Sequence, residues 1–198
     1  MSPQQRFVKR MFDLLLSLIG ILLLWWVIVL AWLVATIETR SNGLFFQKRV
    51  GKDGKIFSVI KIKTMCHSKG ASNNITTSID PRIKKIGRFF RRTKIDEFPQ
   101  LWNVLIGNMS FVGPRPDVSG YADRLFGSDS IILTVRPGIT GPASLKYKNE
   151  ESLLAKKIDP VKYNDDVIWP DKVKINRDYI RDYQFINDLS YIWWTFQK

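Results

Sequence analysis

The sequence has few of the side chains that bind transition metals or form disulfides. Its 198 residues include one cysteine, Cys66, and one histidine, His67. A lone cysteine excludes an intramolecular disulfide and fits a reducing compartment, and one histidine leaves too few soft ligands for a zinc site. We favour a surface-loop histidine over a Ser-His-Asp triad, because nothing around His67 resembles a nucleophile elbow. There is also no internal repeat and no Gly-rich phosphate loop.

Acidic residues are scarce relative to basic ones. The chain has 31 Lys and Arg against 18 Asp and Glu, a formal charge of +13. This excess favours anionic partners, namely nucleic acid, acidic lipid headgroups or phosphorylated small substrates, and charge alone does not choose among them. The length suits one compact domain with a membrane segment.

The stretch Leu14 to Ala35 contains no charged residue. As a helix it would be about 33 Å long, enough to cross a hydrocarbon core of about 30 Å. It is longer than a signal-peptide core and no small-x-small cleavage site follows it. We therefore expect a basic N-terminus and membrane helix over 1–40, followed by a compact domain over 41–198.

Basic residues flank this run on both sides. They are Arg6, Lys9 and Arg10 before it, and Arg40, Lys48, Arg49 and Lys52 after it. The positive-inside rule draws both ends to the cytoplasm. A re-entrant helix would keep both basic clusters on the cytoplasmic side, whereas a straight span would leave one cluster outside. We therefore prefer the re-entrant form. Trp25 and Trp26 in the middle mark either a break or a contact with protein.

Residues 44–65 have the pattern of a β-hairpin, with Asp53-Gly54 as its turn. Alternation places Ile56, Ile60 and Ile62 on one face of the second strand, and Val59, Lys61 and Lys63 on the other. The two lysines form either a phosphate-binding pair or an ordinary solvated face.

Residues 66–79 are polar and are expected to form a loop. Asp80-Pro81 has the pattern of a helix start. The basic stretch 82–92 carries an apolar stripe, consisting of Ile83, Ile86, Phe89 and Phe90. Such a helix suits an anionic membrane interface, although it would also suit nucleic acid phosphates.

A second helix is expected over 97–106, with Phe98, Leu101, Trp102 and Leu105 on its buried face. Asp96 is the expected N-cap, and a Thr93–Asp96 capping box is the alternative. Backbone donors and the helix dipole would then keep Asp96 ionised and attract a phosphate, while Asp96 and Glu97 together could hold Mg²⁺. On these residues alone, a purely structural cap is favoured.

Two stiff Pro/Gly motifs follow, Gly113-Pro114-Arg115-Pro116 and the segment from Arg136 to Gly141. Each holds one Arg, a residue suited to bidentate phosphate recognition. The aromatic stretch 191–196 is too short to span a membrane and fits an interfacial anchor.

In this order the motifs resemble the bacterial sugar transferase family, specifically its small monotopic phosphoglycosyl transferases. The similarity covers nearly the whole chain. It includes the segments Lys9-Arg10-Met11-Phe12-Asp13, Gln47-Lys48-Arg49-Val50-Gly51 with Asp53-Gly54-Lys55, Lys61-Ile62-Lys63-Thr64-Met65, Asp80-Pro81-Arg82, Asp96 to Leu105, and Gly107 to Pro116.

The resemblance implies a covalent mechanism. Asp96 would attack the β-phosphate of a UDP-sugar and release UMP, and a polyprenyl (undecaprenyl) phosphate would then take the sugar phosphate. Glu97 would be catalytic and would hold Mg²⁺. The candidates for binding the diphosphate or the carrier phosphate are Lys61, Lys63, Arg88, Arg115 and Arg136. The enzyme would sit at the inner membrane, against anionic headgroups, as the first membrane step of glycoconjugate assembly.

Two positions depart from the family pattern. Trp25-Trp26 stands where the family usually has the Ser-Pro that breaks its membrane helix, and Pro142-Ala143-Ser144 replaces a frequent aromatic residue.

The expected fold is α+β and mainly helical, with a β-hairpin and interfacial amphipathic helices. The alternatives are a non-catalytic membrane scaffold or lipid-binding protein, which the intact Asp96-Glu97 pair disfavours, and a nucleic-acid-binding protein, which lacks a recognised module. The identity of the UDP-sugar and the oligomeric state do not follow from the sequence.

Overall fold

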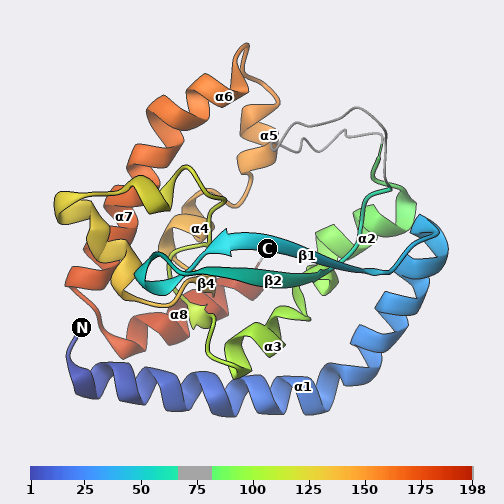
Figure 1. Cartoon of the computed structure of the whole chain (residues 1–198), viewed down its shortest axis with the longest axis horizontal. Helices are drawn as coiled ribbons and strands as arrows, with labels where there is room; N and C mark the ends of the chain where they lie inside the picture. The colour runs from blue at the N-terminus through green and yellow to red at the C-terminus, as the bar shows by residue number, and fades with distance from the viewer. Residues whose placement is uncertain (67–81, 198) are drawn as a thin grey trace.

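The structure is a computed structural model that describes residues 1–66 and 82–197 (Figure 1). Its longest element is helix α1, Pro3–Thr39, which is 37 residues long. Ser2 caps it by accepting from the backbone N–H of Gln5, whose side chain accepts from Ser2 in return. Figure 1 shows α1 running along the base of the molecule and then turning upward toward β1. It is long and apolar enough to cross a membrane.

Both ends of α1 pack against the rest of the protein. In its first half the buried residues are Lys9, Asp13 and Ser17, spaced four apart on one face. In its second half Ala31 and Ala35 pack against Ile62 and Phe90. Because both halves contact the rest of the chain, the helix bends along the surface of the protein and does not project away from it.

A polar cluster holds the first half of α1 in place. Lys9 Nζ lies 2.5 Å from Asp188 Oδ2, and this carboxylate also accepts from the hydroxyls of Tyr179 and Tyr183. Asp13 Oδ1 accepts from the backbone N–H of Phe111 at 3.0 Å. These buried groups are tolerable because Lys9 and Asp188 form an ion pair and Asp13 accepts hydrogen bonds from Ser110 and Phe111.

The predicted hairpin is confirmed. Strands β1, Leu44–Val50, and β2, Ile56–Ile62, pair antiparallel from Leu44↔Ile62 to Val50↔Ile56. Asp53 and Gly54 form the turn with φ of 56° and 73°, values that Asp and Gly tolerate. Ile56 is exposed, whereas Val59 of the opposite face is buried against Val104 and Met109. Helices α1 and α3 both contact β2.

The two short helices after the hairpin are shorter than expected. Helix α2 spans Lys85–Thr93 and α3 spans Gln100–Leu105, with a 3₁₀ turn, Ile95–Glu97, between them. The predicted helix start at Glu97 was wrong, because the backbone N–H groups of Glu97 and Phe98 bond to carbonyls three residues earlier, so this segment is a 3₁₀ turn and α3 begins at Gln100. Ile83, just before α2, and Phe90 within it are buried, while Ile86 and Phe89 of α2 are exposed. His67, the loop from 67 onward and Asp80-Pro81 lie outside the described residues.

The two Pro/Gly motifs come together in space. Strands β3, Ser110–Val112, and β4, Gly138–Thr140, pair parallel beside these motifs. A Cβ at Gly138 would lie 2.2 Å from the backbone nitrogen of Gly113. Only glycine permits this approach, so the glycine spacing brings the Arg115 loop against the segment after Arg136.

The remaining chain is helical. It contains α4 Pro142–Lys146, α5 Glu150–Leu154, α6 Pro160–Tyr163, α7 Trp169–Arg181 and α8 Phe185–Phe196, together with 3₁₀ turns Ala122–Arg124 and Gly127–Thr134 and a π-helical turn Asn164–Ile168. The hairpin turn, Lys52–Gly54, is also 3₁₀. Val173 and Ile180 of α7 pack with Val112 and Ile132 in the largest core cluster. The mainly helical architecture with a small sheet is as predicted, and the division at residue 40 stays a prediction.

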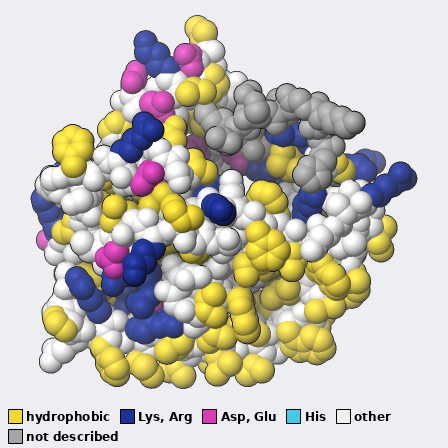
Figure 2. Space-filling view, in the orientation of Figure 1, with side chains coloured by type: hydrophobic (Ala, Val, Ile, Leu, Met, Phe, Trp, Pro, Cys, Tyr) yellow, Lys and Arg dark blue, Asp and Glu magenta, His cyan; other side chains and the backbone are white. Residues whose placement is uncertain are grey.

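Apolar side chains cover one edge of the molecule. In Figure 2 they gather along the base, where α1 runs in Figure 1. Exposed apolar residues occur along α1, at Trp102 and Ile106 at α3, and at Trp193 and Trp194 of α8. Exposed apolar side chains in this number are typical of contact with a membrane or another protein.

The Lys9–Asp188 pair provides a test of the fold. Asp188→Ala should lower the free energy of unfolding by about 3–5 kcal/mol, because Lys9 would be left buried and unpaired. Chemical denaturation in detergent would measure the change. Asp178→Ala, which removes the exposed partner of Arg177, should cost under about 1 kcal/mol. Equal effects of the two substitutions would contradict this account.

Candidate active site

The acidic pair lies on the 3₁₀ turn between α2 and α3. Lys94, with a φ of 60°, ends α2 and turns the chain so that Asp96 faces inward, with 9% of its surface exposed. The predicted N-cap role was wrong. Helix α3 begins after Pro99 without a side-chain cap, and Thr93 bonds to carbonyls of its own helix. Among the described residues, Asp96 Oδ1 has no hydrogen-bond partner.

Glu97 is held by two cations from other parts of the chain. Its Oε1 accepts from Lys61 Nζ of β2 at 3.0 Å and from Arg115 Nη2 at 2.8 Å. Burial is the largest single influence and raises its pKa, but Arg115, Lys61 and Lys94 together outweigh it and bring the pKa well below the ordinary range. Glu97 is therefore ionised throughout the physiological range.

Asp96 has the opposite electrostatic environment. Burial, and then repulsion by Glu97, raise its pKa to about 6, although Lys61, Lys94 and Arg91 act in the other direction. The carboxylate is therefore mostly ionised at neutral pH, but burial opposes that state, and its Oδ1 accepts no hydrogen bond from the described residues. A desolvated carboxylate with an unpartnered oxygen is suited to attack an electrophile.

The other predicted cations do not all converge here. Lys61 and Arg115 meet Glu97, whereas Lys63 Nζ bonds to Ser41 Oγ at 2.7 Å. Arg88 is exposed on α2. Arg136 donates to the Gly107 carbonyl at 2.7 Å, just beyond the opposite end of α3 from the acidic pair.

Arg136 shares its location with Arg10 of α1. The Arg10 guanidinium donates to the carbonyls of Val104 and Leu105 at 2.7 and 2.9 Å. Cations at this end of a helix satisfy its last carbonyls and complement its dipole. The structure thus gives Arg10 and Arg136 a role in holding α3, which carries the acidic pair at its other end.

Sequence reasoning gave no site role to Arg49 or Gln100. Both line a small cavity with Lys61 and Arg115. The signal for Arg49 lies in the hairpin, because the Asp53-Gly54 turn sets a register that pairs Phe45 with Lys61 and Arg49 with Phe57. Directly opposed residues share a face, which places Arg49 and Lys61 on the same side of the sheet.

Magnesium was expected at Glu97. In the described ranges 1–66 and 82–197, no group of three or more His, Cys, Asp or Glu side chains could hold a metal ion. Mg²⁺ needs few protein ligands, however, because waters and substrate phosphates complete its octahedral shell. The orphaned Asp96 Oδ1 beside Glu97 supplies hard oxygen ligands, so the residues present fit such an ion.

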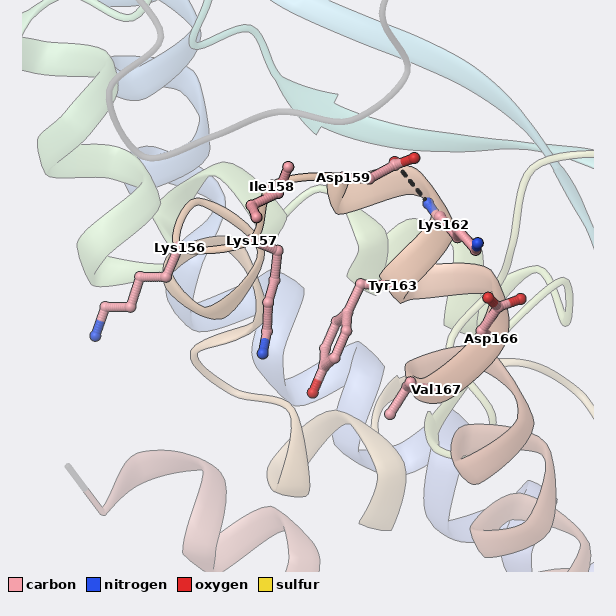
Figure 3. A pocket seen from close by; sticks show the side chains of 8 residues that line it. All are labelled: Lys156, Lys157, Ile158, Asp159, Lys162, Tyr163, Asp166 and Val167. Atoms are coloured by element: carbon pink, nitrogen blue, oxygen red, sulfur yellow. Dashed lines mark hydrogen bonds between the residues drawn. The ribbon is translucent and has the colours of Figure 1, made fainter.

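A larger concavity of about 430 Å³ lies at the tip of α5 and α6 (Figure 3). The Lys157 ammonium stands 4.0 Å from the centre of the Tyr163 ring, which its side chain runs alongside in Figure 3. Its lining includes none of the predicted site residues.

Comparisons with known proteins agree with the resemblance. Residues 4–198 match the bacterial sugar transferase family. The chain is 37% identical over 144 residues to a putative undecaprenyl-phosphate N-acetylgalactosaminyl 1-phosphate transferase of Bacillus subtilis, covering 72% of this chain and 79% of the relative. It is 32% identical over 205 residues to the UDP-glucose:undecaprenyl-phosphate glucose-1-phosphate transferase of Escherichia coli, covering 100% of this chain.

It is also 31% identical over 210 residues to the UDP-galactose-lipid carrier transferase of Erwinia amylovora, covering 96% of this chain. The chain spans 40% of the Erwinia relative and 41% of the Escherichia one. The family match over nearly the whole chain shows that this protein belongs to the bacterial sugar transferase family.

The raised pKa of Asp96 makes a prediction for stability. Because its pKa is about 6 in the fold and 3.8 ordinarily, the stability that protonated Asp96 contributes is lost as pH rises from about 4 through about 6. Asp96→Asn should therefore be more stable than the wild type at pH 8, by at most about 3 kcal/mol, and similar at pH 4.

Denaturation of both proteins at pH 4, 6 and 8 would measure this difference. Other carboxylates contribute similarly to both proteins and largely cancel. Asp178→Asn is the exposed control and should show no such trend. A wild type that is the more stable protein at pH 8 would contradict the raised pKa.

Proposed function

We propose that this protein transfers a sugar 1-phosphate from a UDP-sugar to a polyprenyl phosphate, with Asp96 as nucleophile. The observation that carries the proposal is the juxtaposition of two carboxylates. Asp96 is buried and has an oxygen without a hydrogen-bond partner, and the adjacent Glu97 forms ion pairs with Lys61 and Arg115. The names of the relatives include both a sugar nucleotide and an undecaprenyl carrier.

The reaction has two steps. An Asp96 carboxylate oxygen forms a bond to the β-phosphorus of the UDP-sugar, the bond from that phosphorus to the bridging oxygen breaks, and UMP leaves with the electron pair. A phosphate oxygen of the polyprenyl carrier then attacks the same phosphorus. The bond to Asp96 breaks, which restores the carboxylate and yields polyprenyl-diphosphate-sugar.

Charge placement assigns the supporting roles. Lys61 and Arg115 are fixed by Glu97 and face phosphate charge without reorganising at the moment of reaction. Mg²⁺, when bound at Glu97 and Asp96, would neutralise charge on the departing UMP. Lys63 and Arg88 remain candidates for the carrier phosphate or lipid headgroups. Arg136, through α3, acts as a positioning residue.

UMP release tests this function. With undecaprenyl phosphate and Mg²⁺ in lipid particles, the wild type should release UMP from at least one of UDP-galactose, UDP-glucose or UDP-N-acetylgalactosamine. Asp96→Asn should lower the rate by on the order of 10³-fold or more, and a chelator should also abolish release. Asp166→Asn, an exposed matched change, should retain the wild-type rate. Full activity of an intact Asp96→Asn protein would refute the nucleophile assignment, and a folded wild type inactive with all donors would favour a scaffold.

We also propose that α1 is re-entrant in the cytoplasmic membrane, with the catalytic domain on the cytoplasmic face. Support comes from the contacts that both ends of α1 make with one body, Lys9 with Asp188 and Ala35 with the Ile62 and Phe90 cluster. Ile86 and Phe89 of α2, and Trp193 and Trp194 of α8, are also exposed, and we propose that they contact the membrane interface.

Cysteine labelling tests this topology. In a Cys66→Ser background, Gln4→Cys and Lys48→Cys report the two sides of the apolar run. A membrane-impermeant maleimide should label neither in intact spheroplasts and both after lysis. Labelling of Gln4→Cys alone in intact spheroplasts would establish a straight span.

A further inference from the structure

A small cavity beside the acidic pair contains an unused hydrogen-bond donor. Its volume is about 20 Å³, and its lining consists of Arg49, Val59, Lys61, Gln100, Arg115 and Pro116. Gln100 is 3% exposed, and its Nε2 has no acceptor in the part of the chain that the structure describes. A buried amide without a partner costs free energy, so its persistence requires an explanation.

The chemistry of the walls points to an anion. Three of the six lining residues are cationic, one is the Gln100 amide, and none is acidic. A cavity of this size holds one water or one oxygen atom. An oxygen that carries negative charge would accept from Gln100 and from the cations together.

The walls are fixed before any ligand arrives. Arg49 donates to the Pro116 carbonyl at 3.2 Å and to Gln47 Oε1 at 2.6 Å. Lys61 and Arg115 are both held by Glu97 Oε1, and Gln100 is the first residue of α3. Four chain segments thus converge on one point, and little side-chain freedom is lost on binding.

We propose that this cavity receives one phosphoryl oxygen of the sugar nucleotide's diphosphate, with Gln100 as its donor and Arg49 as a further cation. The proposal rests on the proposed function, because it takes the diphosphate as the ligand. Lys61 and Arg115 link the cavity to Glu97, so an oxygen seated here holds the diphosphate beside Asp96. Gln100 and Arg49 are thereby substrate-binding residues.

Binding of UDP tests the cavity independently of catalysis, because UDP carries both phosphates but lacks the sugar that would be transferred. Gln100→Met keeps the length of the side chain but removes the donor, and should weaken UDP binding between about tenfold and a hundredfold. Gln100→Glu keeps the shape but opposes the anion, and should weaken binding further. Binding of uridine should be the same in all three proteins, and Gln184→Met, at an exposed glutamine, should bind UDP like the wild type.

Thermal unfolding without nucleotide separates binding from packing. Gln100→Met should unfold at the same temperature as the wild type or higher, because it removes an unsatisfied buried donor. Equal UDP affinity in the wild type and Gln100→Met would overturn the proposal and identify the cavity as a water site. If the wild type then still releases UMP from a UDP-sugar, the proposed transfer reaction stands and only the proposed phosphoryl-oxygen site is overturned. Conversely, UDP binding that depends on Gln100 in a protein that releases no UMP would support the site and contradict the reaction.

Discussion

The arrangement of the site depends on the double ion pair of Glu97. A single carboxylate oxygen accepts from Lys61 of β2 and from Arg115 of the loop after β3, so it joins the hairpin, the turn before α3 and the first Pro/Gly motif. Removing Glu97 would leave two cations facing each other in a partly buried place. The same residues affect the pKa of Asp96, because Glu97 raises it while Lys61, one of the two cations bound to Glu97, lowers it.

Asp96 and Gln100 show how the site departs from what stability alone would favour. A buried carboxylate with a raised pKa and a buried amide without an acceptor both cost free energy in the resting protein. Both lie within five residues, directly before and at the start of α3. Local conflicts of this kind concentrate where a protein binds or reacts. The two features are explained together if a phosphorylated ligand supplies acceptors for Gln100 and an electrophile for Asp96.

The sequence predicted those parts of the fold that local rules determine. The Asp53-Gly54 turn identified the hairpin, and the uncharged run identified α1. The start of α3 was misplaced, because the cap rules place it after Asp96, whereas the chain forms a 3₁₀ turn there and the α-helix begins at Gln100. Arg136 was grouped with the phosphate binders from its motif, yet its contact with Gly107 depends on the pairing of β3 with β4. That pairing is long-range, and no local pattern reports it.

The short helix α3 connects the two halves of the proposed task. Its six residues extend about 9 Å, with the acidic pair just before its first residue and Arg10 and Arg136 at its last carbonyls. Trp102 is exposed on it and Ile106 directly after it, and α3 packs along α1. The Asp96 carboxylate therefore lies within about one short helix of the exposed Trp102 and Ile106. In the proposed reaction, a lipid-borne phosphate bound near these two side chains would need to travel little to reach Asp96.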